Sequence, residues 1–248
     1  MAAPVHDSST LLECRSLEVG HAGQALLPPV DLRMRKAEFW AVIGRNGAGK
    51  TTWMRTVLGL LPPVKGQVAH PRGALRSAYL PQRSGLDELY PLLVRDVVRM
   101  GLDRGWSFAH PQRDAAERVQ EALRDMEVAD LTDQPFRRLS EGQKQRVMFA
   151  RLAASRAQVA LLDEPTSAMD AVAECEAFKL LDRMRSKQQT TVVVVSHFLG
   201  VAREYARRVI LMDRDTPAVV VGTAEEVFEH QTFKQRFGEP CIHAHHEQ

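Results

Sequence analysis

The stretch GRNGAGKTT, residues 44–52, limits the possible folds of this chain more than any other feature. It fits the P-loop pattern G-x-x-x-x-G-K-[ST] and stands between the apolar run FWAVIG and the helix-like run KTTWMRTVLGLL. Glycines let backbone N–H groups surround phosphates, while Lys50 reaches the terminal phosphates and the Thr51 hydroxyl binds Mg²⁺. A simple glycine turn would need neither side chain. We expect nucleotide contacts from Gly44, Asn46, Gly47, Gly49, Lys50, Thr51 and Thr52.

Composition excludes several other classes of protein. The chain has 248 residues, enough for one large domain with or without an inserted subdomain. A net charge of +2 gives no argument for binding nucleic acid. The longest apolar runs are too short for a bilayer span, and the first residues lack the pattern of an export signal. Three widely spaced cysteines without a CxxC pair indicate reduced cytosolic thiols.

The strand-like and helical segments predict an α/β fold. Residues 11–40 contain short strands and turns, and VALLDE, TTVVVVSH and RVILMD are continuous apolar runs separated by helical segments. Strands without polar alternation suit a parallel sheet that is covered on both faces. Residues 86–155 have helical spacing without an intervening strand, so we expect an inserted α-helical subdomain there. AVVVG reads as a further edge strand, and TAEEVFEHQTFKQRFG as a last helical segment.

An acidic pair ends one of these strands. Asp163 and Glu164 follow VALL and precede Pro165. An aspartate at the carboxyl end of a buried parallel strand, in a chain with a P-loop, is suited to hold Mg²⁺. The adjacent glutamate can polarise an attacking water as a general base. By themselves the two carboxylates would also suit a solvated acidic turn.

The stretch LSEGQKQR, residues 139–146, predicts a second anion site. Ser140 and Gly142 stand at the start of a helical segment, where free backbone N–H groups and the helix dipole favour negative charge. Alone, this stretch would also fit a well-capped polar helix.

These motifs together resemble those of the ATP-binding cassette (ABC) ATPases. The P-loop, YLPQ, LSEGQKQR, VALLDEPTSAMD and VVSH occur in that family's order. The resemblance covers about residues 11–235, leaving 236–248 as a flexible tail that contains histidines. It implies a P-loop NTPase core with a parallel sheet, an N-terminal antiparallel β segment and the inserted helical subdomain, and it implies ATP with Mg²⁺.

The resemblance also implies how two copies share their sites. In this family two cassettes pack head to tail, so Ser140 and Gly142 of one subunit bind the γ-phosphate held by the P-loop of the other. Asp170 resembles the residue at the seam of the dimer. We therefore expect the partner cassette to be a second copy of this chain.

Two further catalytic positions follow from the same resemblance. Gln82 resembles the glutamine that contacts Mg²⁺ and the attacking water, and that senses the membrane domain. His197 resembles the histidine that hydrogen-bonds the γ-phosphate. With Glu164 as base, the expected catalytic residues are Glu164, His197 and Gln82, and the expected Mg²⁺ ligands are Thr51, Gln82 and Asp163.

The chain departs from the family's pattern at two places. Glu141 stands where glycine is commonest, which adds negative charge near an incoming phosphate unless its side chain points away. His21 stands where the family usually offers an aromatic ring to adenine. Imidazole can stack on adenine, though with less area than tyrosine.

The resemblance predicts the ATPase subunit of a membrane transporter. Because the chain has no span of its own, the integral-membrane permease is expected to be a separate polypeptide, with a substrate-binding protein as a further partner. The chain would then lie peripherally at the cytoplasmic face of the inner membrane. A non-transport ABC ATPase and a nucleotide-dependent regulator without turnover are the alternatives.

The cargo predicted from the sequence is zinc or manganese. YLPQRSGLDELYPLLVRDVVRMG resembles the matching stretch of the zinc and manganese import branch, although importers of iron chelates share part of it. Cys241, His243, His245 and His246 in the tail suit zinc, but they fit a flexible polar tail equally.

Overall fold

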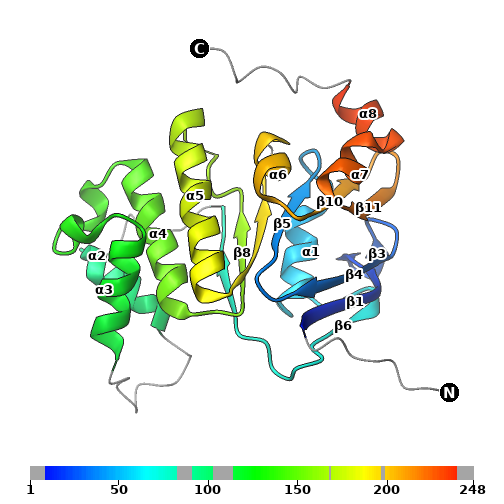
Figure 1. Cartoon of the computed structure of the whole chain (residues 1–248). Helices are drawn as coiled ribbons and strands as arrows, with labels where there is room; N and C mark the ends of the chain where they lie inside the picture. The colour runs from blue at the N-terminus through cyan, green and yellow to red at the C-terminus, as the bar shows by residue number, and fades with distance from the viewer. Residues whose placement is uncertain (1–8, 83–90, 103–113, 168, 197–198, 239–248) are drawn as a thin grey trace. The chain divides into compact units, whose positions relative to one another are not determined.

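The computed structural model describes residues 9–82, 91–102, 114–167, 169–196 and 199–238 (Figure 1). These residues form two units, one of residues 1–75 with 191–248 and the other of residues 76–190. None of the helices in the described ranges combines the length and hydropathy that crossing a membrane requires.

The first unit begins with an antiparallel sheet in the order β4-β1-β6. β1 is the central strand, and its register pairs Cys14 with Leu32 of β4 and with Val68 of β6. In β4 the residues alternate between buried and exposed, as expected for a sheet with one face in the core. The three strands span Thr10–Glu18 (β1), Val30–Arg35 (β4) and Lys65–Ala69 (β6).

The same unit contains parallel strands that carry the P-loop. β10 and β9 flank β5 and run parallel to it, and β11 joins the outer edge of β10 antiparallel. All five residues of β5 and of β9 are buried, which explains their continuous apolar sequences. The strands are Phe39–Ile43 (β5), Thr191–Val195 (β9), Arg208–Asp213 (β10) and Ala218–Gly222 (β11).

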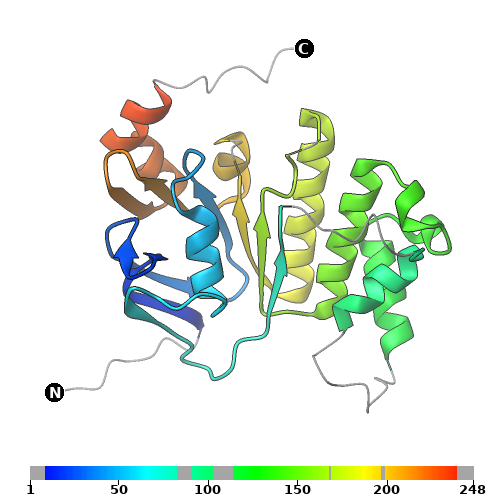
Figure 2. The same cartoon turned by 180° about the vertical axis from the view of Figure 1, so that it is seen from behind.

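Helices cover both faces of these parallel strands. Figures 1 and 2, taken together, show α1, Lys50–Val57, and α6, Leu199–Tyr205, on opposite faces. The expected last helix is instead two helices, α7 (Ala224–Glu229) and α8 (Gln231–Phe237). His230 between them has ψ of 140°, and its imidazole Nδ1 accepts from the N–H of Thr232, so it caps α8 rather than continuing α7.

The second unit holds one parallel strand pair and the predicted helices. β7, Ser77–Leu80, pairs in parallel with β8, Val159–Asp163. Between these strands in sequence lie α2 (Val94–Arg99), α3 (Ala115–Asp125), α4 (Glu141–Ser155) and short 3₁₀ turns at Met100–Leu102, Ala129–Leu131 and Phe136–Arg138. The expected α/β fold class, with parallel strands, an N-terminal antiparallel sheet and a helical insert, is confirmed.

A long helix, α5 (Ala171–Gln188), follows β8 in the second unit. Ionic contacts link it to the inserted helices: Arg146 of α4 contacts Glu176 at 2.5 Å, and Lys187 of α5 contacts Asp125 of α3 at 2.8 Å. Exposed pairs of this kind each contribute little to stability. Phe149 and Phe178, both fully buried, supply the apolar area of this unit's core.

A carboxylate in the antiparallel sheet gives the first unit a measurable dependence on pH. Glu13 of β1 is 6% exposed, and its oxygens accept from Arg15 and Arg33, each at 2.8 Å. These hydrogen bonds, the one from Arg15 first, lower the pKa of Glu13 from 4.5 to about 2. A lowered folded-state pKa stabilises the fold above the unfolded pKa, and that stabilisation is lost as pH falls through the folded value.

We expect Glu13→Gln to flatten the pH dependence of the melting temperature between about pH 5 and pH 2, the interval set by the unfolded and folded pKa values. Thermal unfolding followed by circular dichroism across this range measures the effect. The control is Glu204→Gln, a change of an exposed glutamate in α6 of the same unit. Parallel profiles for wild type and Glu13→Gln would contradict the assignment.

Candidate functional site

The P-loop begins where the backbone leaves β5 and touches the end of β10. Gly44 has φ of 152°, and a Cβ added there would lie 2.3 Å from the carbonyl oxygen of Met212. Any side chain at this position would push the loop off the strand. Gly47 and Gly49 also have positive φ, at 79° and 96°. The glycines of the motif therefore serve a backbone path that other residues cannot follow without strain.

Lys50 lies at the mouth of this loop. Its side chain is buried, and its ammonium donates to the carbonyl oxygens of Gly44 at 2.7 Å and of Arg45 at 3.0 Å. Helix α1 starts at Lys50 with no acidic residue in its first turn and no side-chain cap. The positive end of its dipole and its first N–H groups therefore face the loop, and the helix's own first turn adds no negative charge there. Thr51 and Thr52, half-buried, follow in the same turn.

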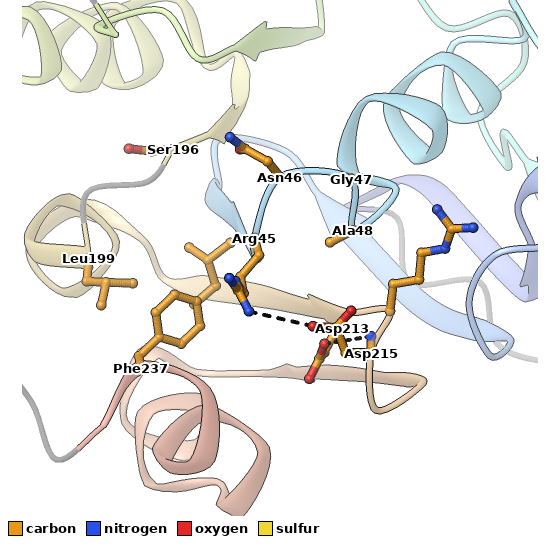
Figure 3. Close-up of a pocket in the computed structure, with 12 residues that line it drawn as sticks. Arg45, Asn46, Gly47, Ala48, Ser196, Leu199, Asp213, Asp215 and Phe237 are labelled. Atoms are coloured by element: carbon orange, nitrogen blue, oxygen red, sulfur yellow. Dashed lines mark hydrogen bonds and ion pairs between the residues drawn. The ribbon is translucent and has the colours of Figure 1, made fainter.

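A cavity of about 760 Å³ opens beside the P-loop within the first unit (Figure 3). One wall is the loop itself, including Arg45 and Asn46, and the others carry Ser196, Asp215 and Phe237. Figure 3 shows Asn46 directed to the side on which Ser196 lies, and Arg45 directed toward Asp215. The guanidinium of Arg45 lies 3.6 Å from the Asp215 carboxylate.

The hairpin that carries His21 reaches the start of α1. It consists of β2 (Gly20–His21) and β3 (Gln24–Ala25), paired antiparallel. The imidazole Nε2 of His21 lies 3.4 Å from the hydroxyl of Thr52. The structure therefore brings two predicted binding residues together that lie 31 positions apart in the sequence.

In the second unit, the predicted base lies against the predicted glutamine. Glu164 follows the last residue of β8, and its carboxylate accepts from the amide Nε2 of Gln82 at 2.5 Å. Asp163, the last residue of β8, is 4% exposed, and it accepts from the hydroxyl of Tyr79 at 3.4 Å. Sequence reasoning missed Tyr79, although its place three residues before Gln82, on the strand that leads to it, was a usable signal.

Ser140 and Gly142 stand at the start of α4, as expected. Ser140 is the N-cap, and its hydroxyl accepts from the N–H of Gln143 at 3.3 Å. A Cβ added at Gly142 would meet no atom within 4 Å, so the fold does not require glycine there. Glu141 is directed to Lys144, which binds its carboxylate at 2.9 Å. This contact offsets the negative charge that Glu141 adds beside the helix start.

Asp170 caps α5, where its carboxylate accepts from the N–H of Ala173 at 2.8 Å. His197 and the tail residues Cys241, His243, His245 and His246 lie outside the described residues. Within the described ranges, no group of three or more His, Cys, Asp or Glu side chains is arranged to hold a metal ion.

The family model described as "ABC transporter" matches residues 27–167. Among curated proteins, the zinc import ATP-binding protein ZnuC of Pseudomonas entomophila (strain L48) is 32% identical over 97% of this chain and 90% of its own length. The hemin import ATP-binding protein HmuV of Streptomyces coelicolor is 35% identical over 96% of this chain and 86% of its own length. The phosphonates import ATP-binding protein PhnC of Trichormus variabilis is 35% identical over 83% of this chain and 91% of its own length.

Solved structures show the same fold. One assigned to the metal-chelate type of ABC transporter, in an inward-facing conformation, matches with a TM-score of 0.81 at 25% identity, over 92% of this chain and 89% of that one. CbiO1 of Clostridium perfringens, part of the ABC transporter complex CbiONQ, matches with a TM-score of 0.78 at 24% identity, over 93% and 95%. The chain therefore belongs to the ABC transporter family, as an ATP-binding protein that hydrolyses ATP.

Proposed function

We propose that this chain is the ATPase subunit of an ABC importer and that it drives a separate permease. The observation that carries the proposal is the P-loop, where the Lys50 ammonium lies over two loop carbonyls at a helix start that has no acidic residue. The three curated relatives named above are all import proteins by name. The membrane-embedded path for the cargo belongs to the partner.

The P-loop residues would bind the triphosphate of ATP. Lys50 exchanges its backbone acceptors for phosphate oxygens, which are stronger partners because they carry charge. The backbone N–H groups from Gly47 to Thr52 surround the β- and γ-phosphates. His21 would stack on the adenine, and its approach to Thr52 of the P-loop supports this role.

Oxygen ligands suit Mg²⁺, and the proposed set of Thr51, Asp163 and Gln82 offers a hydroxyl, a carboxylate and an amide oxygen. The fit is supported by Asp163, which is an acid buried at the end of a strand. When bound, Mg²⁺ offsets the negative charge that builds up on the phosphates during transfer.

Glu164 would act as general base toward the attacking water, and Gln82 would orient it. The hydrogen bond from Gln82 to one carboxylate oxygen of Glu164 supports this pairing, because it holds the two side chains side by side. His197 would hydrogen-bond the γ-phosphate.

A complete site would need a second cassette. We propose a homodimer in which Ser140 and Gly142 of one subunit bind the γ-phosphate held by the other, with Asp170 at the seam. The open space at Gly142 supports this role, since glycine there serves something other than the fold. ATP would then favour the closed dimer, and hydrolysis would reopen it and move the permease.

The proposed cargo is zinc or manganese. Support comes from zinc import relatives at 31–32% identity over 96–97% of the chain. The likeness to a hemin import protein favours a second candidate, a metal chelate. In either case the permease, and a substrate-binding protein where there is one, would select the cargo, and the chain would act at the cytoplasmic face of the membrane.

We expect Glu164→Gln to retain ATP binding and to lower turnover by about 10²–10⁴-fold, the usual contribution of a general base. Phosphate release and nucleotide titration measure the two properties. The matched control is Glu117→Gln, on an exposed face of α3 in the same unit. Wild-type turnover in Glu164→Gln would refute the assignment of the base.

Composite sites predict that two inactive variants rescue each other. Lys50→Ala and Ser140→Ala would each be inactive alone, but a mixed dimer has one site with both an intact P-loop and an intact helix start. We expect ATPase activity from heterodimers isolated with two affinity tags. If isolated heterodimers are as inactive as either homodimer, the shared site is wrong.

Deletion of this chain should reduce cellular zinc or manganese accumulation, and Glu164→Gln should fail to restore it. Uptake of radioactive zinc and manganese, with hemin uptake in parallel, measures this. Normal accumulation of both ions with loss of hemin uptake would replace the proposed cargo by a chelate.

A further inference from the structure

A buried polar pair lies just behind the proposed base in the second unit. The hydroxyl of Thr166 donates to the carboxylate Oε1 of Glu174 at 2.6 Å. Thr166 is 3% exposed and Glu174 is 4% exposed. Thr166 stands two residues after Glu164, and Glu174 lies in the first turns of α5. The pair therefore links the turn after β8 to the helix that follows it.

An acid at this position is costly to the fold. Burial raises the pKa of Glu174, and the hydrogen bond from Thr166 offsets this only in part. The neighbouring core positions of α5, Ala177, Phe178 and Leu181, are apolar. A methionine of similar length would fill the space without removing a carboxyl group from water. The reason for an acid here must lie in the bond that it makes.

The turn that this bond holds is strained at Glu164. Glu164 has φ of 48°, in the left-handed region that side-chain-bearing residues seldom adopt. It also precedes Pro165, and the residue before a proline prefers extended backbone. Such a conformation persists only where the surrounding structure holds it. The backbone bond across this turn, from the N–H of Ser167 to the carbonyl of Glu164, is long at 3.4 Å.

Helix α5 provides a fixed reference for this turn. It has 18 residues and begins at the cap made by Asp170. The chain after Glu164 is thus held at two points, by the hydrogen bond of Thr166 and by the Asp170 cap. Release of Thr166 would let Glu164 relax toward an extended conformation. That would move its carboxylate away from Gln82, which contacts it at 2.5 Å.

We propose that Thr166 and Glu174 are positioning residues for Glu164, holding the strained turn that presents its carboxylate. This inference rests on the proposed role of Glu164 as general base. Neither residue touches the reacting atoms, so their loss should lower kcat and leave the KM for ATP unchanged.

The test compares variants that break the bond with one that keeps it. Thr166→Val removes the donor, and Glu174→Met removes the acceptor. The double variant T166V/E174M removes both and leaves no buried group unpaired, so it should fold. We expect kcat to fall by about 10- to 100-fold in all three, because a ~1 Å misplacement of a catalytic group can cost ~10²-fold. Glu174→Gln keeps a carbonyl oxygen for Thr166 and should restore most of the lost rate.

A double-mutant cycle separates positioning from a general structural effect. If the pair acts through Glu164, adding T166V/E174M to Glu164→Gln should not lower kcat further. Hydrolysis of radiolabelled ATP measures the low residual turnover of these variants. If T166V/E174M lowers kcat by the same factor in the wild-type and the Glu164→Gln backgrounds, the inference is overturned. Wild-type kcat in T166V/E174M, with Glu164→Gln inactive, would also overturn it but leave the base in place. Wild-type turnover in Glu164→Gln would instead refute the assignment of Glu164 as general base.

Discussion

The contact between Gly44 and the end of β10 is the constraint on which the P-loop depends. A Cβ at Gly44 would lie 2.3 Å from the carbonyl oxygen of Met212, so the P-loop starts where only glycine fits. From there the loop turns back over the ammonium of Lys50, which ties together its first two carbonyls. The path of the loop is thus set by its contact with the neighbouring strand and by the side chain of Lys50.

Local patterns in the sequence were enough to predict the elements that carry the site. β5, β8 and β9 are buried over their whole length, and their continuous apolar runs reflect this directly. The spacing of glycines, Lys50 and Thr51 predicted the start of α1 because each residue type meets a separate requirement of a phosphate loop. The prediction of one last helix was wrong, because a single extended residue, His230, divides it into two helices.

Contacts between distant segments could not be predicted in this way. Gln82 and Glu164 lie 82 positions apart, and His21 and Thr52 lie 31 apart. Nothing in either local stretch specifies the distance between such side chains, since the fold alone sets it. Burial of Glu174 is a separate case, because a glutamate on a helix predicts a solvated position and this one is 4% exposed.

The charges around the P-loop cavity show how the field at the phosphate site is kept local. Asp215 contacts both Arg45, at 3.6 Å, and Arg236 of α8, at 3.4 Å, and Arg236 also binds Asp213. In this cluster two guanidinium groups face two carboxylates. The positive charge of Arg45, which belongs to the loop, is therefore offset by a nearby carboxylate. Lys50 and the start of α1 have no acidic residue in the same helical turn, so they would add positive potential at the proposed phosphate site.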